Sequence, residues 1–248
     1  MIQGALQHDK TQPVAMQRAR GSASLAVARL RGQSRLVDLY QSGSAKVMLP
    51  HSHGDAPEAV FLNTSGGLTS GDDLQFAMSV GPGAALTATT QTAERAYLAT
   101  GGPARMTVRA DVAAAARLDW LPQETILFQG AHLLRDTRID LGTGARLILV
   151  EIVVLGRRAM GEVVTHAGLT DRRQVTVNGR PLWFEAQELS PETVPDGVSA
   201  AASGWNGRTL LRATATDLWA LKLYLGQAVA RLTGRPLPRV WQLQGALS

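Results

Sequence analysis

The chain has 248 residues, of which 45% are hydrophobic, and a formal net charge of +5. This length is sufficient for one large β domain with a sizeable core. The chain contains no cysteine, which excludes disulfides, thiolate metal sites, iron–sulfur clusters and thiol nucleophiles.

Neither a membrane nor a nucleic acid is an expected partner of this sequence. No run approaches the ~18 uninterrupted apolar residues of a membrane span, and the polar N-terminal residues lack the apolar centre of a secretory signal. The basic residues are spread along the chain without interleaved aromatic residues or a nucleic-acid-binding motif. We therefore expect a cytoplasmic protein.

Strand patterns dominate the chain after its first residues. Residues 1–20 are predicted to be a flexible basic segment, and residues 21–248 a single β-rich domain. Leu74, Phe76, Met78 and Val80 alternate with polar or small residues, and the same alternation recurs from Met106 to Val112. Turns rich in Gly and Pro separate such segments, so a mainly β fold is predicted.

His51 and His53 form the first candidate metal site. Two histidines separated by one residue can lie on one face of a strand and share a divalent ion. The surrounding segment is typical of a loop, and no third ligand is close in the sequence. A metal site here is a hypothesis that rests on these two residues.

A glycine-rich segment, residues 63–73, follows a short strand pattern. Its glycines permit left-handed backbone, as phosphate-binding loops require. The segment lacks the Gly-Lys-Ser/Thr of a P-loop and the helix that follows a dinucleotide fingerprint. A turn in which Asp72 accepts hydrogen bonds from loop amides is the favoured interpretation.

A repeat runs through the middle of the chain. It consists of an apolar residue, three turn-like residues and Ala-x-Leu, and its three copies begin at Val80, Val112 and Leu141. Near-constant spacing of strand-turn-strand units predicts stacked coils, because equivalent residues then lie above one another and bury a continuous core. The predicted fold is therefore a solenoid-like stack of β-sheets with about two α-helices; an ordinary antiparallel sandwich is the alternative.

Glu151 is the only polar residue in the nine-residue run from Leu147 to Leu155. Such a run is typical of a strand covered on both faces, where a bare carboxylate costs several kcal/mol. Glu151 must therefore be protonated, ion-paired, hydrogen-bonded or in contact with internal water. Arg157 is the candidate partner for a structural ion pair with Glu151 or Glu124.

Stacked coils would bring several polar residues to one interior region. Glu124 and Glu151 each follow a copy of the repeat, and the first copy supplies Gln91 and Glu94. Two carboxylates at a distance of ~5 to 10 Å also suit glycoside hydrolysis, so a carbohydrate-active enzyme using Glu124 and Glu151 is an alternative. Its weakness is the low aromatic content, 5%, because sugar-binding clefts use aromatic rings.

The C-terminal third combines a hairpin, a loop and a helix. Asn178-Gly179 separates two strand patterns and predicts a type I′ turn, in which both residues have positive φ. Residues 190–204 are typical of an exposed loop. After a further strand, residues 217–233 place apolar residues on one face of a predicted amphipathic helix.

Four segments together resemble the urease accessory protein family UreD, also called UreH. They occur in the order and spacing of the family, and the similarity extends from about Gly21 to Glu188. The segments are Asn63-Thr-Ser-Gly-Gly-Leu-x-x-Gly-Asp72, Thr89-Thr90 with Glu94 and Tyr97, Trp120-Leu-Pro-Gln-Glu-Thr-Ile-x-Phe128, and Glu151-Ile-Val-x-Leu-Gly-Arg157-x-x-x-Gly-Glu162.

The resemblance implies a non-catalytic chaperone that joins the accessory proteins UreF and UreG and the urease apoprotein. Nickel would be cargo in transit and not a tightly bound cofactor, and nucleotide would be bound by the partner GTPase UreG. The motif positions that the resemblance implies for a nickel path or buried polar sites are Asp72, Glu94, Glu124, Glu151 and Glu162. A purely structural scaffold without a metal role remains a further alternative.

Overall fold

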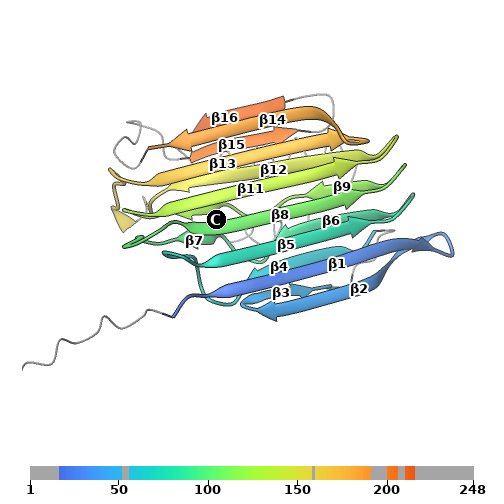
Figure 1. Ribbon diagram of the computed structural model, residues 1–248, viewed down its shortest axis with the longest axis horizontal. Coiled ribbons are helices and arrows are strands. Elements are labelled where there is room, and N and C mark those ends of the chain that lie inside the picture. The colour runs from blue at the N-terminus through green and yellow to red at the C-terminus, as the bar shows by residue number, and fades with distance from the viewer. Residues whose placement is uncertain (1–16, 52–55, 158–159, 191–199, 206–209, 216–248) are drawn as a thin grey trace, which may run out of the picture.

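The computed structural model describes residues 17–51, 56–157, 160–190, 200–205 and 210–215. Almost all of these residues lie in strands or in the turns between them (Figure 1). The strands are β1 (Arg20–Leu30), β2 (Gln33–Gly43), β3 (Ala45–Met48), β4 (Glu58–Asn63), β5 (Asp73–Val80), β6 (Ala85–Thr90), β7 (Glu94–Ala96), β8 (Ala104–Val112), β9 (Arg117–Trp120), β10 (Thr125–Leu127), β11 (His132–Leu141), β12 (Arg146–Leu155), β13 (Gly168–Val177), β14 (Arg180–Leu189), β15 (Ala200–Trp205) and β16 (Leu210–Ala215).

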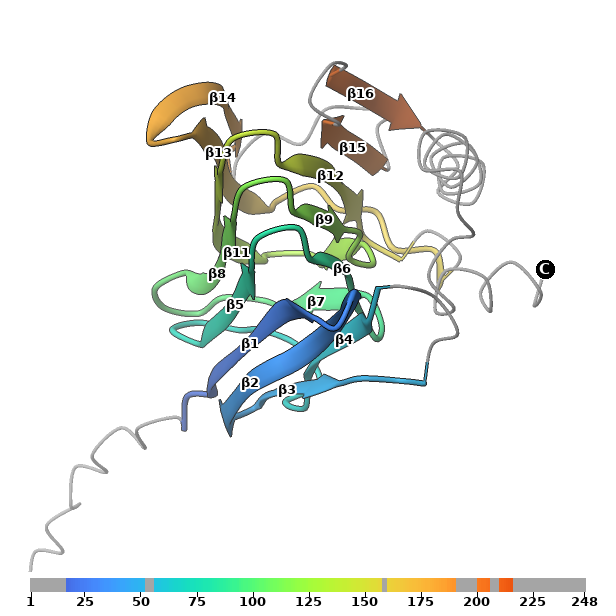
Figure 2. The same ribbon diagram turned by 90° about the vertical axis from the view of Figure 1, so that its right-hand side faces the viewer.

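The strands form two sheets that face each other across one core. The first sheet has the order β14-β13-β11-β8-β5-β1-β2, and the second has the order β16-β15-β12-β9-β6-β4-β3 with β7 and β10 attached beside it. In Figure 2, β5, β8 and β11 lie one above another on one side, and β6, β9 and β12 lie on the other. The chain passes repeatedly from one sheet to the other, which is the architecture of a β-solenoid.

The repeat in the sequence corresponds to successive coils of this solenoid. Val112 is paired in register with Val80 on one side and with Leu141 on the other. Leu118 is paired in the same way with Leu86 and Leu147. Equivalent positions of the three copies therefore stack on one another, and the predicted solenoid is confirmed in place of the sandwich.

The core follows the alternation of the strands. Leu74, Phe76, Met78 and Val80 are all buried, as are their counterparts on β8. The Phe61 ring lies 4.7 Å from the Phe76 ring and 5.9 Å from the Trp120 ring between centroids. These aromatic contacts join β4, β5 and β9, so the second sheet packs closely on the first.

The hairpin at Asn178-Gly179 is confirmed. Both residues have positive φ, 49° and 74°, and β13 pairs with β14 in antiparallel register on either side. Asn and Gly are the residues that tolerate this backbone best, so the local sequence alone fixes the turn.

The C-terminal elements are described only in part. Residues 191–199 of the predicted loop lie outside the described residues, but its last residues, from Ala200, form β15. These residues are small and have low strand propensity, and they form a strand because they pair with β12 and β16. The predicted helix at 217–233 and most of the predicted N-terminal segment also lie outside the described residues, and the described part of the chain contains no α-helix.

The described residues form no helix that is long and apolar enough to cross a membrane.

Candidate functional site

Glu151 lies in a buried network of charged side chains between the two sheets. It is on β12 and only 2% exposed. Arg173 Nε on β13 donates to Glu151 Oε2 at 2.5 Å, and Arg135 Nη2 on β11 lies 3.5 Å from the same oxygen. Trp120 Nε1 and Thr137 Oγ1 donate to the other oxygen, Oε1, at 3.3 and 3.2 Å. Both carboxylate oxygens therefore have donors.

The two arginines extend this network across the first sheet. Each forms an ion pair with Asp171, and Arg173 Nη1 also donates to Glu185 Oε2 on β14 at 3.3 Å. Arg135 Nη1 donates to Thr125 Oγ1 on β10 at 3.1 Å. Two guanidiniums thus face three carboxylates, which gives a net charge of −1 when every group is ionised.

The charges within the network determine the ionisation of Glu151. Burial on its own raises the pKa of a carboxyl, but the Arg135 and Arg173 guanidiniums and the Arg173 hydrogen bond lower the pKa of Glu151 to about 2. The carboxylate is therefore ionised at all physiological pH values. Of the states that the sequence allowed for Glu151, the structure shows an ion pair supplemented by hydrogen bonds.

Arg157 forms an ion pair, but with a different partner from those predicted. Its Nε donates to Glu162 Oε2 at 2.8 Å, and neither Glu124 nor Glu151 is its partner. The hydrogen bond from Arg157 lowers the pKa of Glu162. The Arg157 guanidinium also lies 4.6 Å from the centroid of the Phe128 ring, a cation–π contact at the surface.

Arg135 and Arg173 were not predicted as the partners of Glu151, although the burial pattern of their strands is visible in the sequence. Arg135 alternates with Leu133 and Thr137 on the core-facing side of β11, and Arg173 alternates with Asp171 and Val175 on β13. A charged residue at a core-facing position requires a partner of opposite charge. Two such arginines in neighbouring strands predict buried acids nearby.

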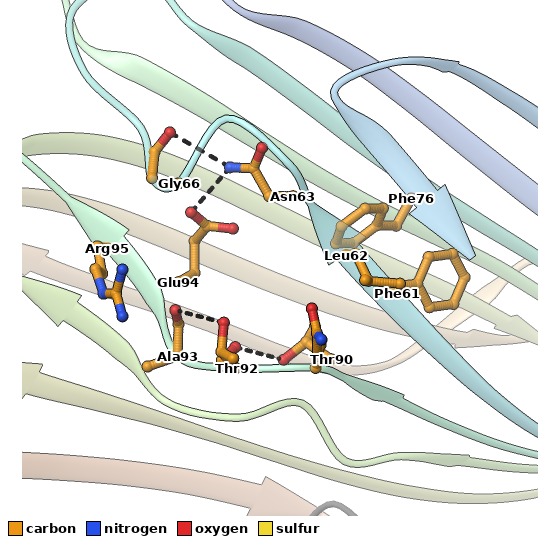
Figure 3. A pocket seen from close by; sticks show the side chains of 12 residues that line it. Phe61, Leu62, Asn63, Gly66, Phe76, Thr90, Thr92, Ala93, Glu94 and Arg95 are labelled. Atoms are coloured by element: carbon orange, nitrogen blue, oxygen red, sulfur yellow. Dashed lines mark hydrogen bonds between the residues drawn. The ribbon is translucent and has the colours of Figure 1, made fainter. Parts of the chain in front are cut away.

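Glu94 occupies a different environment, a polar pocket beside β4 and β7. The pocket has a volume of about 390 Å³ including its open mouth, and it is lined by Asn63, the Gly66-Gly67 turn and residues 90–95. In Figure 3 the Glu94 side chain points toward Asn63, whose Nδ2 donates to Glu94 Oε1 at 3.1 Å. Burial raises the pKa of Glu94 to about 7, against smaller lowering effects of Asn63 and Arg95.

The structure brings Glu94, Glu124 and Glu151 into one continuous region. Glu94 N donates to the Glu124 carbonyl oxygen at 2.9 Å, and the next residue, Thr125, is in register with Glu94. Thr125 in turn accepts a hydrogen bond from Arg135, the partner of Glu151. Glu124 is itself buried, and it immediately precedes Thr125 in the chain.

Asp72 is a structural residue of the turn that precedes β5. Its Oδ1 accepts a hydrogen bond from Ala19 N at 2.8 Å, and its Oδ2 accepts one from Thr69 N at 2.9 Å. This is the turn interpretation favoured from the sequence. Asp72 therefore ties the entry of β1 to the glycine-rich segment.

Metal ligands do not gather in the described residues. No group of three His, Asp or Glu side chains in that part of the chain is placed to hold one ion. His51 is exposed, and His53 lies outside the described residues, so the two-histidine site stays a hypothesis.

The substitution Glu94→Gln is expected to stabilise the protein at pH 8 and to change little at pH 5. The pKa of Glu94 is raised on folding from 4.5 to about 7, so ionisation opposes folding and wild-type stability falls as the pH rises through this interval. Glutamine removes that cost, which we expect to be about 1 to 3 kcal/mol after allowance for contact with solvent. Urea unfolding at both pH values, with a chelator present, measures the difference; equal effects at pH 5 and 8 would contradict the prediction.

Comparison with known proteins identifies the family of this chain. The family model described as UreD urease accessory protein matches residues 19–197. The chain belongs to the UreD family. It is 43% identical over 265 residues to the urease accessory protein UreD of Cereibacter sphaeroides, covering 92% of this chain and 96% of the relative.

More distant UreD proteins match over the same extent. Identity is 40% to the protein of Paracoccus denitrificans, covering 95% of this chain and 96% of the relative, and 37% to that of Agrobacterium fabrum, covering 95% of each. The resemblance noted in the sequence is thereby confirmed. The segment matched to the UreD model contains the Glu94 pocket and the whole Glu151 network.

Proposed function

We propose that this UreD chain assists urease maturation by assembling with the urease apoprotein, UreF and UreG, and by passing nickel along an internal polar path that includes Glu94. Membership of a family of urease accessory proteins supports the role in maturation. The proposal places the protein in the cytoplasm, assigns nucleotide binding to UreG and treats nickel as cargo. Catalysis is not part of the proposed role.

The observation that carries the nickel path is the environment of Glu94. Its carboxyl group lies in the wall of an open polar pocket, and the hydrogen bonds it accepts come from neutral groups, the Asn63 side chain and the Arg95 backbone. No ion pair joins Glu94 to another described residue. Carboxylate, amide and hydroxyl oxygens bind a divalent ion less tightly than thiolates or several imidazoles do, which suits release as well as capture.

In this proposal the other candidate acids have different roles. Glu124 continues the path from Glu94 into the interior. Glu151 is held by two guanidiniums, so its role is to maintain the polar interior and not to bind a cation directly. Asp72 and Glu162 support turns at the ends of strands.

The two alternatives are less well supported by these contacts. A glycosidase would need Glu151 free to act on a substrate, whereas its carboxylate is 2% exposed and ion-paired. A scaffold without a metal role would leave the Glu94 pocket without a function, and experiment separates this alternative from the nickel path.

The test measures nickel in urease that has been activated with the wild-type chain or with Glu94→Gln. We expect the variant to co-purify normally with the urease apoprotein, UreF and UreG but to load nickel roughly tenfold more slowly, the effect of about 1.4 kcal/mol on the transfer barrier. Glu188→Gln, at an exposed glutamate on β14, is the matched control and should load at the wild-type rate. Normal loading by an assembled Glu94→Gln complex would leave only the scaffold role.

A further inference from the structure

The strand β2 forms an apolar edge at one end of the solenoid. It is the terminal strand of the first sheet in the described part of the chain, and ten of its eleven residues are exposed. Leu36, Val37, Leu39 and Tyr40 are 39%, 51%, 38% and 55% exposed. A long exposed edge of this kind is a template for a further strand.

The inner side of β2 continues the apolar core. Leu36 is paired with Val27 of β1, and Leu39 with Leu25, and both partners are buried. Directly opposite residues of an antiparallel pair point to the same face of the sheet. Leu36 and Leu39 therefore face the interior layer, but the strand across from them, β3, has only four residues and leaves them uncovered. Solenoids normally end in a polar cap, and none of the described residues forms one over β2.

The backbone of β2 limits the length of a regular pairing. The β1–β2 register shifts between Ala26 and Val27, so that Val37 is the extra residue of a bulge. A bulge increases the local twist and interrupts the ladder. The uninterrupted part of the edge runs from Asp38 to Gly43, long enough for a strand of about five residues.

Charge determines which kind of segment fits this edge. Between residues 20 and 48 the chain has five basic residues, Arg20, Arg29, Arg31, Arg35 and Lys46, and one acid, Asp38. The difference, 5 − 1 = +4, accounts for most of the formal charge of +5 of the whole chain. Arg35 is paired with Ala28, on the face opposite Leu36 and Leu39.

We propose that β2 is the docking site for an extended segment of another protein, in which apolar residues alternate with acidic ones. The segment adds as a strand along residues 38–43. Its apolar side chains cover Leu39, and its carboxylates lie on the outer face, the face of the sheet that carries Arg35 beyond the bulge. Backbone hydrogen bonds supply affinity and the alternating side chains supply specificity, as in other cases of strand addition.

A second copy of this chain is a poorer occupant of the same edge. Two β2 edges would bring together two regions of charge +4, and like charges across an interface oppose association.

The test uses the full-length chain and two synthetic peptides, one of alternating valine and glutamate and one of alternating valine and lysine. We expect the acidic peptide to slow amide hydrogen exchange in residues 38–43 and to bind at least tenfold more tightly than the basic peptide, with an affinity that falls as salt is added. Arg35→Glu and Leu39→Lys should each weaken binding of the acidic peptide about tenfold.

The opposite edge of the same sheet supplies the control. Leu182→Lys on β14 introduces the same charge at an exposed leucine and should leave peptide binding unchanged, and thermal unfolding checks that all variants are folded. Equal binding of both peptides, no protection of β2, or protection of β2 through dimerisation of the chain alone would each overturn the proposal. None of these measurements depends on nickel or urease, so the proposed maturation role is tested separately.

Discussion

Replacing Arg173 with methionine is expected to unfold the protein or to lower its free energy of unfolding by about 3 to 5 kcal/mol. Arg173 contacts three buried carboxylates, those of Glu151, Asp171 and Glu185. Without it, Arg135 alone would face Glu151 and Asp171, and Glu185 would lose its ion pair with Arg173. A buried charge that loses its partner destabilises the fold by more than the ion pair stabilises it. Since typical domains are stable by 5–15 kcal/mol, this loss is a large fraction of the total.

The matched control for Arg173→Met is Arg138→Met. Arg138 also forms an ion pair, with Asp136 at 3.0 Å, but its side chain is 54% exposed. Exposed ion pairs contribute at most about 1 kcal/mol, so we expect a correspondingly small change. Urea unfolding monitored by tryptophan fluorescence compares the two variants, and similar losses for both would contradict an energetic role of the buried network.

The contacts of Arg173 also separate the features that can be predicted from the sequence from those that cannot. The solenoid was predictable because the Ala-x-Leu copies report a local, repeated geometry, and the hairpin was predictable because Asn178-Gly179 determines its own backbone. The burial of Glu151 followed from its aliphatic neighbours in the same way. These features depend on residues close together in the chain.

The identity of the partners of Glu151 depends on distant residues. Arg173 lies 22 residues away from it, on the opposite sheet, and which residues meet there is decided by how the coils stack. Arg157 follows Glu151 closely in the sequence, but Gly156 has a positive φ of 70° at the end of β12, and the chain turns there. Arg157 consequently lies in the loop that follows, where Glu162 is its partner. The Glu94 pocket could not be predicted for a related reason, since its walls come from three separate segments.

Replacing Gly67 with alanine is expected to cost about 2 to 5 kcal/mol and to disturb the mouth of the Glu94 pocket. Gly67 has φ +150°, a conformation that residues with a side chain rarely adopt, and an added Cβ would lie 2.7 Å from the Arg95 carbonyl oxygen and 2.3 Å from the Tyr97 ring. The Tyr97 ring can rotate, but the Arg95 carbonyl cannot move freely because it accepts a hydrogen bond from Leu68 N at 2.7 Å. The substitution would therefore separate the glycine-rich turn from β7, which carries Glu94.

The adjacent glycine provides the control that separates backbone strain from contact. Gly66 also has a positive φ, +80°, but a Cβ there would meet no atom within 4 Å. We expect Gly66→Ala to cost only about 1 kcal/mol, the strain of the left-handed backbone alone. Urea unfolding gives both values, and hydrogen exchange at residues 94–96 reports whether β7 is released. If Gly67→Ala were no more destabilising than Gly66→Ala, the close approach of this turn to β7 would not be what shapes the pocket. A larger loss of stability for Gly67→Ala, with faster exchange in β7, would mean that the contact of Gly67 with β7 positions Glu94 in the pocket wall.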